Sequence, residues 1–92
     1  MTKVKQLANN QFIINGKDEN NNEVEWLQSY DSIIVRRCEN EEVFSKNVYL
    51  DQKYWDYSKT TSKYRNKFLG ETTKETQAKI KSGEYILTDL NQ

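Results

Sequence analysis

Residues 54–83 read YWDYSKTTSKYRNKFLGETTKETQAKIKSG, and along them the hydrophobic residues stop alternating and take the spacing of an α-helix. Ser58 is a typical N-cap for a first helix over Lys59–Leu69. Gly70 stands where a left-handed residue commonly ends a helix. Thr61, Tyr64 and Phe68 fall on the side of this helix opposite Lys59, Lys63, Asn66 and Lys67, so we expect Tyr64 and Phe68 to pack on the rest of the domain.

A second helix follows the first. Glu75 comes three residues after Thr72, and this spacing matches a capping box at the start of a helix. We expect the second helix to end at Ser82 and Gly83. The stretch Tyr85–Leu90 is again short and apolar, and it suits either an edge strand or a packed extended segment.

The part of the chain before Tyr54 has the pattern of β-strands. Four stretches are short, rich in β-branched or aromatic residues, and separated by polar loops. They are Gln11–Asn15, Glu23–Ser29, Ser32–Cys38 and Val43–Leu50, with hairpin connections expected over Gly16–Asn22 and Glu39–Glu42. The sequence therefore predicts one α+β domain over residues 1–92: an antiparallel β-meander of about four strands, followed by two short α-helices and a short C-terminal extended segment.

Alternation within the strands predicts which side chains form the core. In EVEWL, Val24 and Trp26 flank the charged Glu25, so we expect the sheet to have one apolar face and one wet face. The expected core residues are Phe12, Ile14, Val24, Trp26, Ile33, Val35, Val48 and Leu50.

The composition excludes several kinds of catalytic and metal site. There is no histidine and one cysteine, Cys38, so Ser–His and Cys–His nucleophiles, His-containing zinc sites and an internal disulfide are excluded. Asp18, Asn20 and Asn22 resemble the start of a calcium loop, but the glycine and the final glutamate of such a loop are missing. We interpret this tract as a hairpin loop. The sequence indicates no enzyme, no metal and no cofactor.

The N-terminal residues 1–10 contain no apolar run that resembles a signal peptide, and no stretch of the chain has the length and apolarity of a membrane span. We therefore expect no membrane partner and a cytoplasmic location.

Charge is unevenly distributed although the net charge is zero. Residues 1–52 hold six Lys/Arg against nine Asp/Glu, whereas residues 53–81 hold eight Lys/Arg against three Asp/Glu. Such an asymmetry indicates an anionic partner. The acidic half suits a basic protein surface, and aromatic and arginine side chains are typical interface anchors. A protein-binding module is the interpretation that uses most of these features.

The basic half gathers its charge on the first predicted helix, where lysines recur every fourth residue behind a cluster of aromatic side chains. The candidate partner-binding residues are Lys59, Lys63, Arg65, Lys67, Tyr54, Trp55 and Tyr57. The alternative function is a small nucleic-acid-binding domain, in which these lysines contact phosphates and the rings stack on bases. The zero net charge is atypical of such a domain. A simpler explanation also stays open: the lysines solubilise an amphipathic helix, and the aromatic side chains cover the sheet.

Two segments resemble motifs of a known group of proteins. Ser29–Ile34 reads SYDSII, and Trp55–Thr61 reads WDYSKTT. Both resemble a family of small proteins of unknown function carried by bacterial phages and other mobile elements, and the resemblance covers roughly residues 28–91. It implies an accessory role in a bacterial host cell, such as binding and blocking a host protein, possible targets being restriction and CRISPR nucleases. The family supplies no catalytic residues.

Two interpretations of the WDYSKTT segment stay open. Asp56 and Ser58 can bond the free amides of a helix start, which makes the segment a strand-to-helix corner. Alternatively, Thr60, Thr61, Ser62 and Lys63 at the helix N-terminus bind an anion. A homodimer that covers an apolar patch through the C-terminal strand is also compatible with the sequence.

Overall fold

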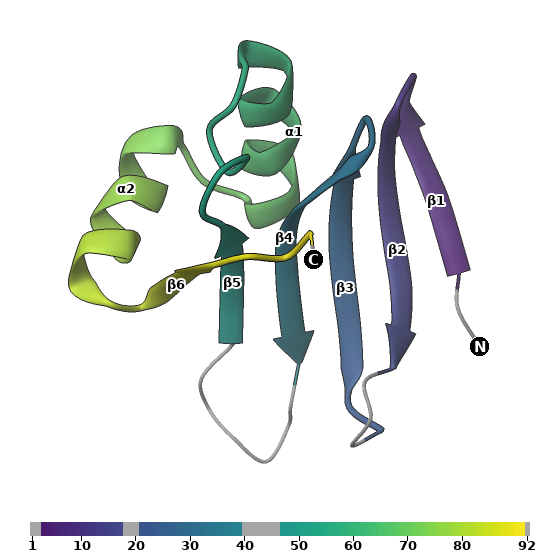
Figure 1. The fold of residues 1–92 in the computed structure, drawn as a ribbon, viewed down its shortest axis with the longest axis horizontal. Coiled ribbons are helices and arrows are strands. Elements are labelled where there is room, and N and C mark those ends of the chain that lie inside the picture. The colour runs from purple at the N-terminus through teal and green to yellow at the C-terminus, as the bar shows by residue number, and fades with distance from the viewer. Residues whose placement is uncertain (1–2, 18–20, 40–46, 92) are drawn as a thin grey trace.

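The computed structural model describes residues 3–17, 21–39 and 47–91 as one six-stranded sheet with two helices (Figure 1). The elements are β1 (Lys3–Ala8), β2 (Gln11–Lys17), β3 (Glu23–Ser29), β4 (Ser32–Glu39), β5 (Asn47–Asp51), α1 (Lys59–Leu69), α2 (Thr73–Ser82) and β6 (Tyr85–Thr88). The strands lie in sequence order across the sheet. Neighbours from β1 to β5 are antiparallel, and β6 joins β5 in parallel. The predicted α+β class and the meander are confirmed, and the sheet is larger than predicted.

The two additional strands are the edges of the sheet. β1 was not predicted, because its residues KVKQLA are mostly polar and its first four side chains are exposed. An edge strand gains its place through backbone hydrogen bonds on one side, and lysines on such a strand oppose edge-to-edge aggregation. β6 confirms the edge-strand interpretation of the C-terminal stretch. Strand β5 contains the second half of the predicted strand Val43–Leu50, and residues 43–46 lie outside the described residues. Asp18 and Asn20 of the predicted hairpin loop also lie outside them.

Both helices begin and end at the predicted residues. The Ser58 hydroxyl accepts a hydrogen bond from the Thr61 amide at 3.2 Å, and Gly70 ends α1 with a φ of 70°. At α2 both halves of the capping box between Thr72 and Glu75 are present. These ends were predictable because each cap is a contact between residues three or four apart in the sequence.

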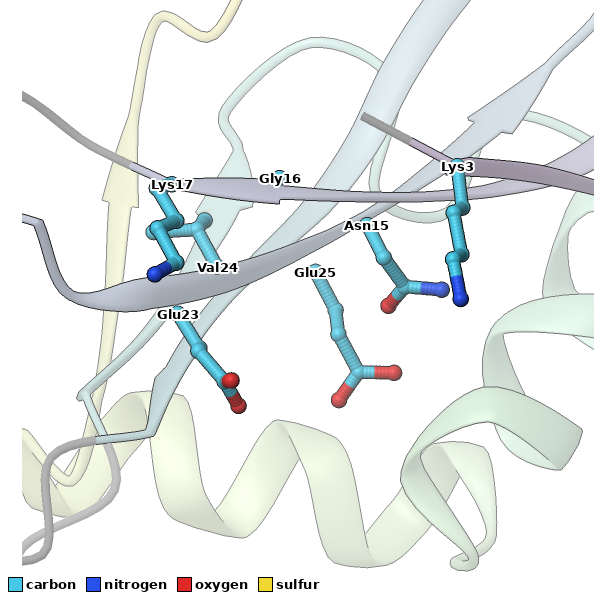
Figure 2. Close-up of a pocket in the computed structure, with 7 residues that line it drawn as sticks. All are labelled: Lys3, Asn15, Gly16, Lys17, Glu23, Val24 and Glu25. Atoms are coloured by element: carbon cyan, nitrogen blue, oxygen red, sulfur yellow. The ribbon is translucent and has the colours of Figure 1, made fainter. Parts of the chain in front are cut away.

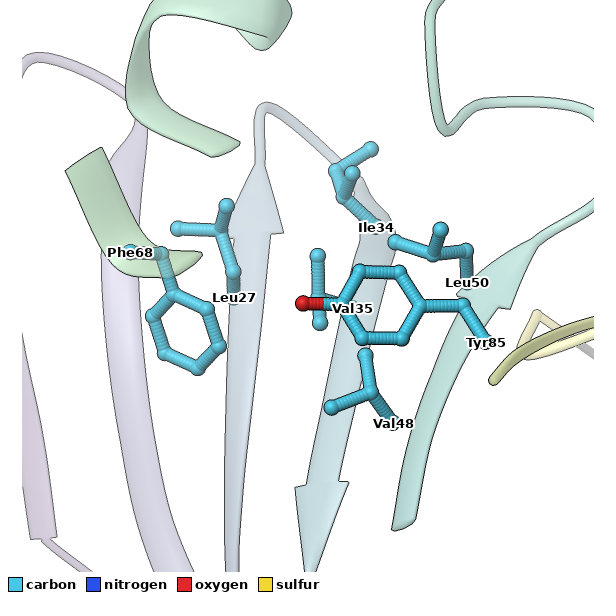
Figure 3. Packing of buried hydrophobic residues seen from close by; sticks show 7 residues of the cluster. All are labelled: Leu27, Ile34, Val35, Val48, Leu50, Phe68 and Tyr85. Atoms are coloured by element: carbon cyan, nitrogen blue, oxygen red, sulfur yellow. The ribbon is translucent and has the colours of Figure 1, made fainter. Parts of the chain in front are cut away.

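The core lies between the sheet and the helices, as Figure 3 shows. It consists of Leu27, Ile34, Val35, Val48, Leu50, Phe68 and Tyr85. Phe68 belongs to α1, and Ile80 of α2 packs against the same cluster. Both helices therefore cover one face of the sheet.

A β-bulge changes which residues of β4 enter this core. Leu27 pairs with Val35 whereas Gln28 pairs with Ile33, so Ile34 is an extra residue on β4. Ile34 and Val35 are consequently both buried, at 1% and 0% exposure. Strict alternation had predicted Ile33 and Val35 instead.

The predicted burial is correct for Val24, Val35, Val48 and Leu50 and wrong for the other four predicted core residues. Phe12, Ile14, Trp26 and Ile33 are half-buried and lie on the face of the sheet opposite the helices. Val24 is buried, but it also lies on that opposite face and is not part of the core cluster. Alternation separates two sets of side chains, and only the packing of the helices decides which set forms the core.

Candidate partner-binding site

The corner between β5 and α1 is built around Asp51, which is 1% exposed. One carboxylate oxygen accepts hydrogen bonds from the amides of Lys53 and Tyr54 at 3.0 and 2.9 Å, and the other accepts from the amide of Leu90 at 2.8 Å. Burial raises the pKa of this carboxyl, but the hydrogen bonds from Leu90, Tyr54, Asn91 and Lys53 outweigh burial and bring the pKa below its ordinary value. Asp51 thus joins the corner to the C-terminal segment.

Arg65 was predicted to contact a partner beside the lysines, but the structure places it in the interior, at 0% exposure. It lies four residues after the buried Thr61 and is therefore on the packed side of α1. Its guanidinium donates to the Trp55 carbonyl, to Asp56 at 3.2 Å and to Thr73 at 2.7 Å. The role of Arg65 is to hold the corner and the start of α2 against α1.

Trp55 is also separated from the other predicted site residues. The Arg65 guanidinium lies 5.1 Å from the centroid of its ring. The ring lines a cavity of about 510 Å³ against α2, together with Ala78 and Ile80, and Lys74 and Lys81 also line it. Trp55 therefore faces α2 rather than the lysines of α1.

The three lysines of the predicted site remain on the surface of α1. Lys59, Lys63 and Lys67 are exposed. The ammonium groups of Lys63 and Lys67 lie 5.6 and 5.4 Å from the ring centroid of Tyr64. Tyr64 was predicted to pack on the domain with Phe68 and was not among the predicted site residues, but it is half-buried and lies outside the core cluster.

Tyr54 and Tyr57 line a separate cavity of about 200 Å³, which we call the corner cavity. Their ring centroids are 5.4 Å apart in an edge-to-face arrangement. The cavity lies between the corner and the turn that joins β3 to β4. Its other lining residues are Ser29, Tyr30, Asp31, Ser32, Ile34 and Thr61.

The corner cavity brings together residues of Ser29–Ile34 and of Trp55–Thr61, the two segments singled out in the sequence. The hydroxyl groups of Ser29 and Thr61, which are 32 residues apart, lie 3.1 Å from each other. The corner interpretation of WDYSKTT agrees with the contacts, because Ser58 caps α1 and Asp56 accepts a hydrogen bond from Ser62 at 2.6 Å. Tyr30 and Asp31 were missed as site residues, since nothing local to their turn indicates that it meets residues 54–61.

The open face of the sheet carries a second candidate surface. One row of paired residues crosses all six strands on the face away from the helices: Val4, Ile14, Trp26, Arg36, Tyr49 and Ile86. We call this the cross-sheet row. Val4 and Ile86 at its ends are 62% and 48% exposed, and the residues between them are half-buried. The Arg36 guanidinium lies 5.6 Å from the centroid of the Tyr49 ring.

A third cavity, of about 270 Å³, lies at the end of strands β1–β3 that is far from the β3–β4 turn. Figure 2 shows Lys3, Asn15, Glu23 and Glu25 extending from these strands. Lys17 also lines this cavity, so the lining has two positive charges, from Lys3 and Lys17, and two negative charges, from Glu23 and Glu25. Glu25 also pairs with Arg37 at 3.0 Å. Balanced charges favour neither an anion nor a cation as ligand, so this cavity adds no chemical indication.

A polar cluster of Glu71, Lys79 and Tyr85 joins the two helices to β6. Tyr85 donates its hydroxyl to Glu71, and the Lys79 ammonium lies 3.4 Å from that carboxylate. Burial, followed by the contact with Glu71, raises the pKa of Tyr85 to about 12. The pKa of Lys79 is also raised, because contacts with Tyr85 and Glu71 outweigh the effect of burial. Both groups stay protonated donors at neutral pH, which suits a structural link.

Comparisons with known proteins supply a family without a function. A model described as a family of unknown function, DUF8033, matches residues 2–84. No curated protein and no solved structure matches the chain. Within the described residues, neither helix is long and apolar enough to cross a membrane, and no group of three or more Cys, Asp or Glu is placed to hold a metal ion.

Proposed function

We propose that this chain, which belongs to the DUF8033 family, is a non-enzymatic binding protein that captures another protein. The cross-sheet row is the observation that carries the proposal. At a strand spacing of about 4.8 Å it is roughly 24 Å long, which is comparable with the width of a standard protein interface. Five of its six side chains are apolar or aromatic, which is unusual for a chain with a mean hydropathy of −1.03, and apolar patches at a surface commonly mark interaction sites.

The composition of the row fits an interface. Trp26, Arg36 and Tyr49 are adjacent at its centre, and tryptophan, arginine and tyrosine are the residue types that contribute most binding energy at protein interfaces. The apolar residues on either side, Ile14 and Ile86, can exclude water from that centre.

The lysine face of α1 is the second proposed contact surface, and it consists of Lys59, Lys63 and Lys67. It lies on the helix-covered side of the sheet, opposite the cross-sheet row (Figure 1). A compact partner therefore contacts one surface or the other, and separate variants can distinguish them.

The resemblance to small phage and mobile-element proteins supports a more specific proposal. On this proposal the protein acts in the cytoplasm of a bacterial host and blocks or modulates a host protein, including one that defends the cell against foreign DNA. The support is the resemblance of residues 29–34 and 55–61, both of which lie within the family match.

Capture from a bacterial lysate by the immobilised protein tests the proposal. We expect Trp26→Ala to reduce capture of the specific partner about tenfold or more, because truncating a central interface tryptophan commonly costs over 2 kcal/mol. The double variant Lys63→Glu/Lys67→Glu examines the second surface. Lys74→Glu/Lys81→Glu on α2 makes the same change of charge elsewhere and serves as its control. Partner recovery is quantified by mass spectrometry, with the thermal midpoint of each variant measured in parallel.

The outcomes separate the surfaces. Loss with Trp26→Ala alone assigns the cross-sheet row, and loss with Lys63→Glu/Lys67→Glu alone assigns α1. Equal capture by every folded variant contradicts both surfaces. If a second copy of the chain covers the row, sedimentation equilibrium shows a dimer that Trp26→Ala dissociates.

One observation favours nucleic-acid binding as a second candidate function. Lys63 and Lys67 lie on either side of Tyr64 on the surface of α1, an arrangement that can contact two phosphates and stack one base. The zero net charge favours the first proposal.

Fluorescence anisotropy of labelled single-stranded DNA and RNA tests this second function. For a site that neutralises two phosphates of a single strand, we expect the logarithm of affinity to fall with the logarithm of salt concentration at a slope of about −1.4, and Lys63→Glu/Lys67→Glu to flatten it. No binding at about 20 mM salt, where the electrostatic attraction is strongest, would exclude this function.

A further inference from the structure

The corner cavity has one formal charge in its lining. That charge is the carboxylate of Asp31, and the other lining side chains are tyrosine, serine, threonine and isoleucine. Among the described residues none pairs with Asp31. An exposed carboxylate beside aromatic rings, without a cation of its own, favours a positively charged ligand.

The aromatic rings around Asp31 also favour a positively charged ligand. Tyr30, Tyr54 and Tyr57 line the cavity, and the faces of aromatic rings attract cations. The chain already uses Tyr54 in this way, because the Lys53 ammonium lies 5.3 Å from the centroid of its ring. Lys53 is not part of the cavity lining, so its position leaves the cavity available.

The size of the cavity limits the ligand. Its volume of about 200 Å³ is smaller than the roughly 300–1,000 Å³ that accommodates drug-sized ligands. A single side chain fits this scale, whereas a nucleotide with its phosphate does not. The negative charge of Asp31 also opposes a phosphate.

The backbone conformation of Tyr30 indicates a functional role for the aromatic ring at this position. Tyr30 has a φ of 56°, a left-handed conformation that aromatic residues disfavour and asparagine or glycine adopt readily. Hydrogen bonds from its amide to the Asn10 carbonyl, at 2.6 Å, and to its carbonyl from the Gln28 side chain, at 2.8 Å, hold this conformation. The ring is 52% exposed, so packing does not require it. Strained residues of this kind often serve ligand binding.

We propose that the corner cavity receives a lysine or arginine side chain from a partner protein. The cationic group lies against the rings of Tyr30 and Tyr57 and pairs with the Asp31 carboxylate, while the aliphatic part of the side chain contacts Tyr54 and Ile34. The inference rests on the proposed protein-binding function only in that a polypeptide supplies the side chain. It adds a site that neither the cross-sheet row nor the lysine face contains.

NMR titration tests this inference without any partner protein. The probes are N-acetyl-lysine methylamide, N-acetyl-arginine methylamide and N-acetyl-norleucine methylamide, the last having an aliphatic side chain similar to that of lysine without the charge. We expect the two cationic probes to shift the ring signals of Tyr30, Tyr54 and Tyr57 with a dissociation constant in the millimolar range, and the norleucine probe to bind about tenfold more weakly.

Two variants and one control sharpen the test. Asp31→Asn removes the charge and is expected to weaken the cationic probes about fivefold. Tyr30→Asn removes a ring and relieves the backbone strain, so the affinity should fall by a similar factor while the thermal midpoint stays equal or rises. Tyr64→Leu, which changes a tyrosine outside the cavity lining, should leave probe binding unchanged.

Equal shifts with the norleucine probe, or unchanged affinity in Asp31→Asn, would overturn the cation site. Shifts of the same ring signals by an oligothymidylate would replace it with a site for single-stranded nucleic acid. If the cationic probes bind as expected and no variant alters lysate capture, the cavity stands and the proposed contact surfaces fail. If the Trp26→Ala result holds and the probes do not bind, the cavity inference alone fails.

Discussion

Asp51→Asn should lower the free energy of unfolding by about 3 kcal/mol, since hydrogen bonds to a buried charged group contribute roughly 1.5–3 kcal/mol each and several are affected. The carboxylate of Asp51 is 1% exposed and accepts from the backbone amides of Lys53, Tyr54 and Leu90. An asparagine keeps one acceptor oxygen and turns its NH₂ group toward at least one of these donors. The corner and the C-terminal segment therefore lose their common acceptor.

The same residue predicts how stability depends on pH. The pKa of Asp51 is lower in the folded protein than in the unfolded chain, where it is about 3.9. Its stabilising contribution is therefore complete above about pH 4 and is lost as the pH falls through the folded pKa. We expect the free energy of unfolding of the wild type to fall more steeply below pH 4 than that of Asp51→Asn.

Urea unfolding, followed by tryptophan fluorescence from pH 7 to about pH 2.5, measures both effects. Asp31→Asn is the matched control, because it makes the same chemical change at an exposed carboxylate and should alter stability by less than about 0.5 kcal/mol. Equal losses in the two variants at pH 7 would contradict the role assigned to Asp51.

Arg65→Met should lower the free energy of unfolding by about 2–4 kcal/mol. Methionine retains much of the aliphatic volume but none of the donors. The Trp55 carbonyl and the hydroxyl of Thr73 lose a partner, and the cation no longer lies against the Trp55 ring. A buried polar group without a partner costs about 1–3 kcal/mol, and the Trp55 carbonyl loses its donor in this way, whereas the Thr73 hydroxyl still accepts from Asn66 at 3.3 Å.

The control for Arg65 isolates its ion pair. Asp56→Asn removes only the negative charge, and the side chain of Asp56 is 39% exposed, so we expect a loss below about 1 kcal/mol. Chemical unfolding of both variants at pH 7 provides the comparison. A loss in Arg65→Met no greater than that in Asp56→Asn would contradict the stabilising role assigned to the hydrogen bonds of Arg65.

The helices and their ends were predictable from the sequence because their signals are local. Ser58, Gly70 and the pair Thr72 and Glu75 act on residues of their own helix, so a single stretch contains both the cap and what it caps. The meander from β2 to β5 was predictable for a related reason, since short polar loops bring successive strands together. The polar strand β1 gives little such signal and was missed.

The faces of the sheet were not predictable in the same way. Trp26 and Leu27 are neighbours in the sequence, yet Leu27 belongs to the core and Trp26 to the open face. Strand alternation is compatible with either choice, and the bulge at Ile34 then reverses the alternation within β4. Only the position of α1, whose Phe68 belongs to the same core cluster as Leu27 and Val35, decides between the two faces.

Some features of the candidate site were likewise predictable from the sequence, and others depend on the tertiary structure. The sequence alone determined the helix boundaries, the exposed lysines of α1, and the absence of histidine and of a second cysteine. Only the tertiary structure decided that Arg65 is internal, that Trp55 faces α2, and that Tyr30 and Asp31 join Tyr57 around one cavity. The reason is physical. Capping, solubility and chemical capacity depend on residues close in the chain, whereas burial and the formation of a cavity depend on contacts between different elements, such as Arg65 with Thr73, 8 residues apart, and Ser29 with Thr61, 32 residues apart.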